Sequence, residues 1–341
     1  MIEFKDVAFQ YEQGSSKGKI ENINLTIHDG EVVLICGESG CGKTTLTRLI
    51  NGLIPHYYEG TLTGQTICGR DRCKKCIPLC FVWCGWFCFS KFQGHNFLQL
   101  DTTSEIAFGC ENLAIDADEI NLRIEKTVGA LKIEDLLNRS LFALSGGEKQ
   151  KIACASVSAM EPDIFVLDEP SSNLDIKSIR ELKDVLRKWK AQGKTIVIAE
   201  HRLYYLMDIA DRVLYMQGGQ IKENLSISDF KKKSTGELHA LGLRTLQSED
   251  FSKMQSTVCA TKQLYIRDFE VSYKNASRGK KKKRKVLDIS DLMIPQGSVV
   301  GVVGNNGAGK TTFANNLCGL LKTAKRLYEH EWKNLYGKSE N

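Results

Sequence analysis

The strongest constraint on the fold is an internal repeat that places one glycine-rich loop in each half of the chain. Residues 2–11 read IEFKDVAFQY and residues 31–45 read EVVLICGESGCGKTT; residues 265–273 read YIRDFEVSY and residues 298–312 read SVVGVVGNNGAGKTT. A repeat of this kind indicates two copies of one domain. The second copy leaves too little chain after its loop to close a parallel sheet. We therefore expect a complete domain over 1–246, a linker over 247–261 and the N-terminal part of a second domain over 262–341.

The first copy predicts an α/β fold with a mainly parallel sheet. Its short apolar runs are typical of buried strands, and they are Val32–Cys36, Ile164–Leu167, Thr195–Ala199 and Val213–Met216. Between them, Ser178–Gln192 carries its apolar residues on one helical face. Strands and amphipathic helices in alternation favour a parallel sheet covered by helices. The alternating segments Ile2–Tyr11 and Ile20–His28 predict an added antiparallel layer.

The first glycine-rich loop predicts a phosphate-binding site. Residues 37–44 read GESGCGKT and directly follow a predicted buried strand, which is the context that the G-x-x-x-x-G-K-[ST] pattern requires. Small residues let backbone N–H groups turn toward phosphates at the start of a helix. Lys43 would reach the β- and γ-phosphates of ATP, and the Thr44 hydroxyl would bind Mg²⁺. Residues 304–311 repeat the pattern.

Two acids follow another predicted strand, in residues 164–169, which read IFVLDE. Asp168 is placed to hold Mg²⁺ through water, and Glu169 to polarise the attacking water as a general base. Taken alone, such a pair is more often a charge pair in the first turn of a helix. The motifs that surround this pair in the sequence favour the catalytic interpretation.

Three further motifs complete a set: residues 144–150 read LSGGEKQ, residues 171–175 read SSNLD, and His201 follows the strand Thr195–Ala199. In order and spacing the set resembles the ATP-binding-cassette (ABC) family. The resemblance implies a P-loop NTPase fold with an antiparallel β layer and a helical subdomain, and a head-to-tail dimer of two cassettes. It implies that His201 is the switch histidine, which senses the γ-phosphate, and that residues 144–150 are the signature, which covers the partner's ATP.

The residues that this resemblance assigns to ATP fall in four groups. They are Tyr11, which would stack on adenine; Gly37, Glu38, Ser39, Gly40, Cys41, Gly42, Lys43, Thr44 and Thr45; Ser145, Gly146 and Gly147; and, in the second copy, Gly304, Asn305, Asn306, Gly307, Ala308, Gly309, Lys310, Thr311 and Thr312. The second copy carries no signature, no acid pair after a strand and no switch histidine.

Residues 51–64, 100–113 and 195–206 are similar to the ATPases of energy-coupling-factor importers. This finer resemblance implies uptake of a vitamin or a metal ion through a separate transmembrane subunit, at the cytoplasmic face of the membrane. Two alternatives stay open: a soluble tandem ABC ATPase of the translation-factor type, and an inactive remnant that binds ATP.

Composition adds few constraints. The run Lys280–Lys285 carries six positive charges, which equals the net charge of +6 of the whole chain. The rest of the sequence is therefore close to neutral, and its charge gives no reason to expect nucleic-acid binding. The longest apolar stretch, Ile77–Phe89, is shorter than the roughly 20 residues of a membrane span. Residues 1–10 alternate polar and apolar residues and contain neither a basic stretch nor an apolar one, so we expect no signal peptide there.

Residues 65–99 depart from the family pattern. A glutamine that links Mg²⁺ to the membrane partner is expected at position 91, where this chain has Lys91, and six cysteines crowd the region: Cys68, Cys73, Cys76, Cys80, Cys84 and Cys88. A zinc site and a structured insertion are two interpretations. The third, which we favour, is translation out of frame, because residues 89–97 read one register over become F-Q-(I/V)-P-R-S-Q-F-F.

Overall fold

The computed structural model describes residues 1–12, 19–68, 71–72, 86–89, 98–172, 174–246, 263–274, 283–304, 306–320 and 324–330. The chain divides into two compact units, Met1–Ser248 and Glu249–Asn341. The predicted linker and most of residues 65–99, including Cys73, Cys76, Cys80, Cys84 and Lys91, lie outside the described residues. No helix in the described ranges is both long and apolar enough to span a bilayer.

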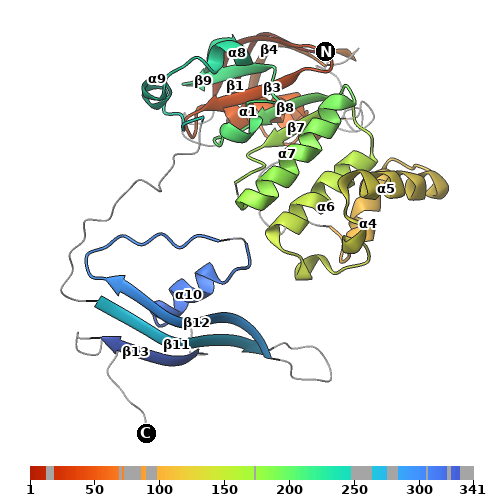
Figure 1. Ribbon diagram of the computed structural model, residues 1–341. Coiled ribbons are helices and arrows are strands. Elements are labelled where there is room, and N and C mark those ends of the chain that lie inside the picture. Colours follow the sequence, from red (N-terminus) through yellow and green to blue (C-terminus); the bar gives the residue numbers. More distant parts are fainter. Residues whose placement is uncertain are drawn as a thin grey trace. The chain divides into compact units, whose positions relative to one another are not determined.

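A six-stranded sheet forms the centre of the first unit (Figure 1). Its order is β10 (Gln220–Ser226), β9 (Arg212–Gln217), β3 (Val32–Gly37), β8 (Thr195–Ala199), β7 (Ile164–Asp168) and β6 (Trp86–Phe89). Only the pairing of β10 with β9 is antiparallel; the other four pairings are parallel. The four predicted buried strands and the parallel sheet are confirmed.

An antiparallel layer covers one face of this sheet. Its order is β2 (Ile20–Ile27), β1 (Ile2–Tyr11), β4 (Gly60–Cys68) and β5 (Asp71–Arg72). Val33 and Ile35 of β3 belong to the core that this layer forms with α1 (Lys43–Ile50). The predicted antiparallel pairing of the first two segments is confirmed. A short helix, α2 (Leu53–His56), leads from α1 toward β4.

Helices cover the opposite face, where Val32 and Leu34 of the same strand are buried. Alternate residues of a strand point to opposite faces, so β3 is apolar along its whole length. Figure 1 shows α7 (Ile176–Ala191) lying along the sheet. The residues of α7 that are buried are those predicted from its periodicity: Ile179, Leu182, Val185, Leu186 and Trp189.

A helical subdomain inserts between β6 and β7. It contains α4 (Thr102–Asn112), α5 (Ala117–Leu131), the 3₁₀ turns η2 (Glu134–Leu136) and η3 (Leu141–Ala143), and α6 (Gly146–Ala159). Asp101 caps α4 by accepting bonds from the Thr103 and Ser104 amides, both at 3.0 Å, which satisfies donors that a helix start leaves open. The first unit ends with η4 (Tyr204–Leu206), α8 (Ile227–Phe230) and α9 (Thr235–Ala240).

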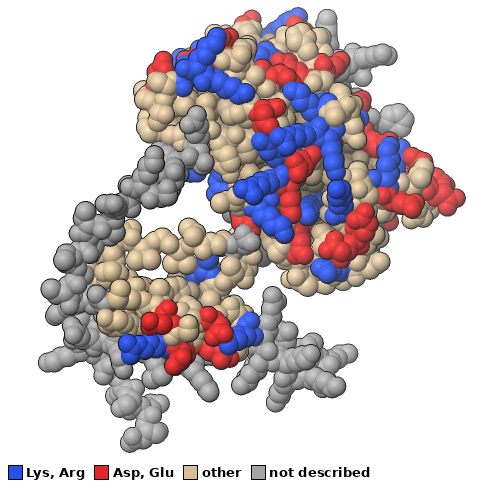
Figure 2. Space-filling model, in the orientation of Figure 1, with Lys and Arg blue, Asp and Glu red and all other residues tan. Residues whose placement is uncertain are grey.

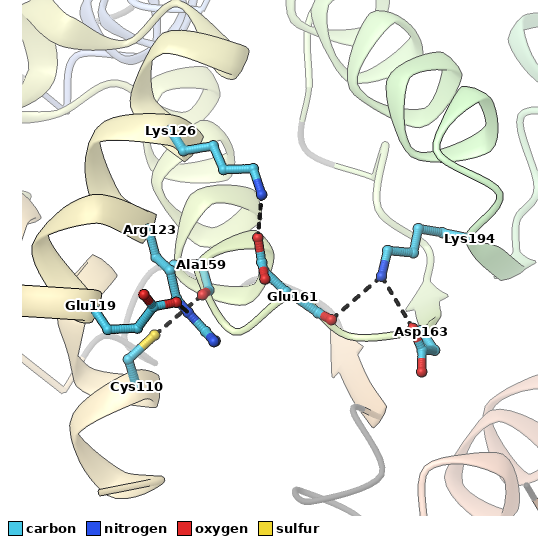
Figure 3. A network of polar contacts seen from close by, with 8 residues as sticks. All are labelled: Cys110, Glu119, Arg123, Lys126, Ala159, Glu161, Asp163 and Lys194. Carbon is cyan, nitrogen blue, oxygen red and sulfur yellow. Dashed lines mark hydrogen bonds and ion pairs between the residues drawn. The ribbon is translucent and has the colours of Figure 1, made fainter. Parts of the chain in front are cut away.

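A polar network joins this subdomain to the sheet (Figure 3). Glu161, in the turn between α6 and β7, pairs with Lys126 of α5 at 2.5 Å. The Glu161 carbonyl accepts from Lys194 at 3.4 Å, and Lys194 also pairs with Asp163 at 3.2 Å. Helix α5 and the segment that leads into β8 thus both contact the turn between α6 and β7.

Paired charges occupy the outer face of α7, where acidic and basic side chains alternate in Figure 2. Asp208 pairs with Lys183 at 2.7 Å and with Arg187 at 2.5 Å. Lys190 pairs with Asp211 at 2.6 Å. Exposed pairs of this kind each contribute about 0–1 kcal/mol.

The second unit is a three-stranded antiparallel sheet with one helix. Its order is β12 (Lys283–Pro295), β11 (Gln263–Lys274) and β13 (Ala324–His330). Phe313 of α10 (Lys310–Leu317) packs with Ile266, Phe269 and Val271 of β11. Residues 298–304 match the first unit's β3 in sequence but belong to no strand in the described structure.

Candidate nucleotide-binding site

The glycine-rich loop Gly37–Gly42 joins the end of β3 to the start of α1. Three of its residues have positive φ: Gly37 (148°), Gly40 (83°) and Gly42 (107°). A Cβ on Gly37 would lie 2.2 Å from the Met216 carbonyl oxygen, whereas one on Gly40 would meet nothing within 4 Å. The loop is therefore fixed on its inner side and open at Gly40, where a phosphate can approach the backbone.

Lys43 is the first residue of α1 and is buried. Its Nζ donates to the carbonyls of Gly37 and Glu38, both at 2.8 Å. The N-terminus of α1 has no side-chain cap. Helix N–H groups, an open glycine and a lysine fit an anionic phosphate chain.

Thr44 and Asp168 have the donor chemistry that suits Mg²⁺. Thr44 follows Lys43, and Asp168 ends β7 with only 3% of its surface exposed. A buried carboxylate needs a cation or donors around it, and hydroxyl and carboxylate oxygens are the ligands that Mg²⁺ prefers. A magnesium ion carried in with ATP would be held by these two residues and would neutralise phosphate charge.

Glu169 and His201 lie against each other. His201 Nε2 is 3.4 Å from Glu169 Oε1. Glu169 has a left-handed φ of 49°, and its amide donates to the Ala199 carbonyl at 2.8 Å. Burial and, after it, the charge of Lys43 lower the pKa of His201, while Glu169 acts in the opposite direction. The imidazole is therefore neutral near pH 7 and offers one hydrogen-bond donor and one acceptor.

Tyr11 closes one side of the site. Its hydroxyl lies 3.3 Å from Thr45 Oγ1 and accepts from Arg48 Nη1 at 3.0 Å. The Arg48 guanidinium lies 3.9 Å from the centre of the Tyr58 ring. This arginine and second tyrosine were not predicted, because neither belongs to a motif.

The predicted signature residues lie at the start of α6. Ser145 and Glu148 form a capping box, in which Ser145 Oγ accepts from the Glu148 amide at 3.3 Å and Glu148 accepts from the Ser145 amide at 2.7 Å. A Cβ on Gly147 would lie 2.2 Å from Ser178 Oγ at the start of α7. The start of α6, which carries the signature, thus lies directly against the start of α7.

The second glycine-rich loop has nearly the conformation of the first. Its φ values are 152° at Gly304, 82° at Gly307 and 91° at Gly309, and Lys310 Nζ donates to the Gly304 carbonyl at 2.6 Å. Lys310 also begins a helix, α10. The other predicted residues of this loop are described as well, namely Asn306, Ala308, Thr311 and Thr312, while Asn305 lies outside the described residues.

The sequence profile of the ABC transporter family matches residues 20–172 and 287–335, more than half of the chain. The chain belongs to the ABC transporter family. A relative from Treponema denticola, named as an ABC transporter ATP-binding protein, is 42% identical over 327 residues. The alignment covers 95% of this chain and 66% of that protein, so the chain spans less than the whole relative.

Solved ABC proteins share the fold. The structure of cbiO1 from Clostridium perfringens, part of the ABC transporter complex cbiONQ, is 24% identical with a TM-score of 0.61, covering 70% of this chain and 92% of that one. A dimer of the ATP-binding cassette MJ0796, in a post-hydrolysis state with ADP and Pi, is 24% identical with a TM-score of 0.58, covering 67% and 99%. The predicted P-loop NTPase fold is confirmed.

One acidic residue of this ABC chain was missed in the sequence. Glu200 lies between β8 and His201 and is 2% exposed. It accepts hydrogen bonds from the amides of Ser171, His201 and Arg202 and from the Tyr205 hydroxyl. Its position directly after an apolar strand could have marked Glu200 as a candidate, but a role was predicted only for the neighbouring His201.

Proposed function

We propose that this chain binds and hydrolyses Mg·ATP as the ATP-binding subunit of an ABC transporter. The observation that carries the proposal is the Glu169–His201 pair at 3.4 Å, close enough to Lys43 for the lysine charge to lower the histidine pKa. A base, a neutral imidazole and a phosphate-binding lysine are thus combined in the first unit.

In this proposal each residue acts on ATP in a distinct way. Lys43 and the loop amides bind the β- and γ-phosphates. Glu169 accepts a proton from the water that attacks the γ-phosphorus, and His201 donates a hydrogen bond to a γ-phosphate oxygen. Tyr11 stacks on adenine. The signature residues Ser145, Gly146 and Gly147 contact ATP held by a second cassette.

The domain assignment and the partners are part of the same proposal. Residues 1–246 form a complete cassette, 247–261 a linker and 262–341 part of a second cassette. The dimer partner is another ABC ATPase domain, and a transmembrane subunit holds the pair at the cytoplasmic face of the membrane. The likeness to cbiO1, part of an ABC transporter complex, and residues 51–64, 100–113 and 195–206 support an energy-coupling-factor-like importer of a vitamin or a metal ion.

Glu169→Gln tests the hydrolytic function. Gln keeps the shape but removes the base, so ATP turnover is expected to fall by about 10²-fold or more while ATP binding persists. Glu111→Gln is the matched control, because Glu111 is exposed on α4. Parent-like turnover in Glu169→Gln contradicts the assignment. A parent protein that binds ATP without turnover supports the inactive remnant, and sedimentation with ribosomes instead of membranes supports the translation-factor type.

We also propose that residues 65–99 are an out-of-frame product that replaces the glutamine-bearing coupling loop. An ammonium at position 91 offers no acceptor to Mg²⁺ and repels it. We therefore expect ATP binding with weak or uncoupled hydrolysis, and poor docking to a membrane subunit. Peptides of the native protein that read F-Q-x-P-R-S-Q-F-F would support this. A confirmed reading frame with stoichiometric zinc in the purified protein contradicts it.

A further inference from the structure

We propose that Glu200 is a positioning residue that joins the loop after β7 to the loop after β8 and so fixes Glu169 relative to His201. The inference rests on the proposed ATPase function. It concerns a buried carboxylate that takes no part in the chemistry assigned above.

The four donors of Glu200 come from both loops. Oε1 accepts from the amides of His201 (2.7 Å) and Arg202 (3.1 Å), which shapes the turn that carries the switch histidine. Oε2 accepts from the Ser171 amide at 3.2 Å, two residues after Glu169, and from the Tyr205 hydroxyl of η4 at 3.0 Å. One side chain therefore bridges the two catalytic loops.

Three other contacts cross between the same loops. The Glu169 amide donates to the Ala199 carbonyl at 2.8 Å, Arg202 Nη1 donates to the Leu174 carbonyl at 3.2 Å, and His201 meets Glu169. Glu200 lies within this set, and its own amide donates to the Ile35 carbonyl of β3 at 3.0 Å. The bridge is thus anchored on the strand that leads into the phosphate-binding loop.

A carboxylate is required at this position because all four partners donate. A glutamine offers one acceptor oxygen and one NH₂ group. The NH₂ group fits best beside Tyr205, whose hydroxyl can turn to accept, and it then faces the Ser171 amide. The Ser171 N–H group loses its acceptor inside a buried site, which costs about 1–3 kcal/mol. Glu200→Gln therefore releases the loop after β7 selectively.

The experiment compares the full-length parent with Glu200→Gln by steady-state kinetics and by hydrogen exchange of residues 168–174. We expect kcat to fall about tenfold or more with KM for Mg·ATP within about threefold of the parent. We expect amide exchange in 168–174 to accelerate by about tenfold. Glu105→Gln is the matched control, because Glu105 is also a buried carboxylate and accepts the Leu98 and Gln99 amides at 3.1 and 3.0 Å. It is expected to leave kcat and exchange in 168–174 unchanged.

Each outcome decides for or against Glu200. Parent-like kcat together with parent-like exchange in Glu200→Gln overturns the inference. A rise in KM that matches the loss of turnover, with no local change in exchange, shows a general structural role and also overturns it. If the parent shows no turnover, the proposed function fails. The positioning role is then tested only by comparing amide hydrogen exchange of residues 168–174 in the parent and in Glu200→Gln.

Discussion

At the scale of single residues, Lys43 bonds two loop carbonyls where a bound phosphate would offer it oxyanions. Replacing the lysine removes a charge-assisted hydrogen bond of roughly 1.5–3 kcal/mol. Lys43→Ala is therefore expected to weaken ATP binding about tenfold or more, as measured by titration with a fluorescent ATP analogue. Lys222→Ala, which removes the same charge from an exposed position on β10, is expected to bind like the parent. Equal affinity in all three proteins contradicts the assignment of the loop.

The protonation of His201 gives a second prediction at this scale. Burial and then Lys43 lower its pKa, and Glu169 raises it. In a titration followed by NMR of the imidazole, we expect the pKa to lie below the usual value of about 6.5. Lys43→Ala is expected to raise it and Glu169→Gln to lower it further. Shifts of the opposite sign would show that the two charges lie elsewhere in solution.

The same shift has a consequence for stability. Because the pKa of His201 is lower in the folded state, the unfolded chain binds the proton more readily once the pH falls below about 6.5. The stability that the neutral imidazole contributes is complete above that pH and is lost as the pH falls through the folded-state pKa. His201→Gln is expected to flatten the loss of thermal stability on acidification over this window.

At the scale of elements, the sequence identified those parts whose burial is decided by their own pattern. β3, β7 and β8 are buried along their whole length and are apolar apart from Asp168 and Thr195, and α7 buries the face that its periodicity marks. The contacts of Glu200, Arg48 and Tyr58 could not be predicted, because they join residues from separate elements. Those contacts depend on how strand ends and helices are brought together, which no local pattern records.

Gly147 offers a test of how elements hold the signature. A Cβ there would lie 2.2 Å from Ser178 Oγ and 3.1 Å from Ser178 Cβ. Gly147→Ala is therefore expected to push α6 from α7 and to lower the free energy of unfolding by about 1–3 kcal/mol. Adding Ser178→Ala removes the nearer clash and is expected to restore part of the loss, measured by denaturant unfolding. Equal stability of the single variant and the parent would show that the contact relaxes without cost.

At the scale of the whole molecule, the two glycine-rich loops share a conformation but differ in surroundings. Gly37 packs under the Met216 carbonyl, whereas the nearest atom to a Cβ on Gly304 is Ala308 Cβ at 3.5 Å. In the first unit, β8 and β9 pair with the strand before the loop. In the second unit, no described strand pairs with residues 298–304. The loop conformation is thus local, and the burial of the preceding residues depends on neighbouring strands.

Val32 and Val299 occupy the same position in the two repeats, so the difference in burial can be tested on this pair. Val32 is 0% exposed and Val299 is 101% exposed. Val32→Asp buries a charge within the sheet, which costs several kcal/mol, so we expect it to unfold the first unit and abolish ATP binding. Val299→Asp places its charge in water and is expected to change the free energy of unfolding by no more than about 0.5 kcal/mol. Thermal unfolding and ATP titration of both variants check this. A large destabilisation by Val299→Asp would show that this residue is covered in solution, because an exposed carboxylate has no desolvation cost.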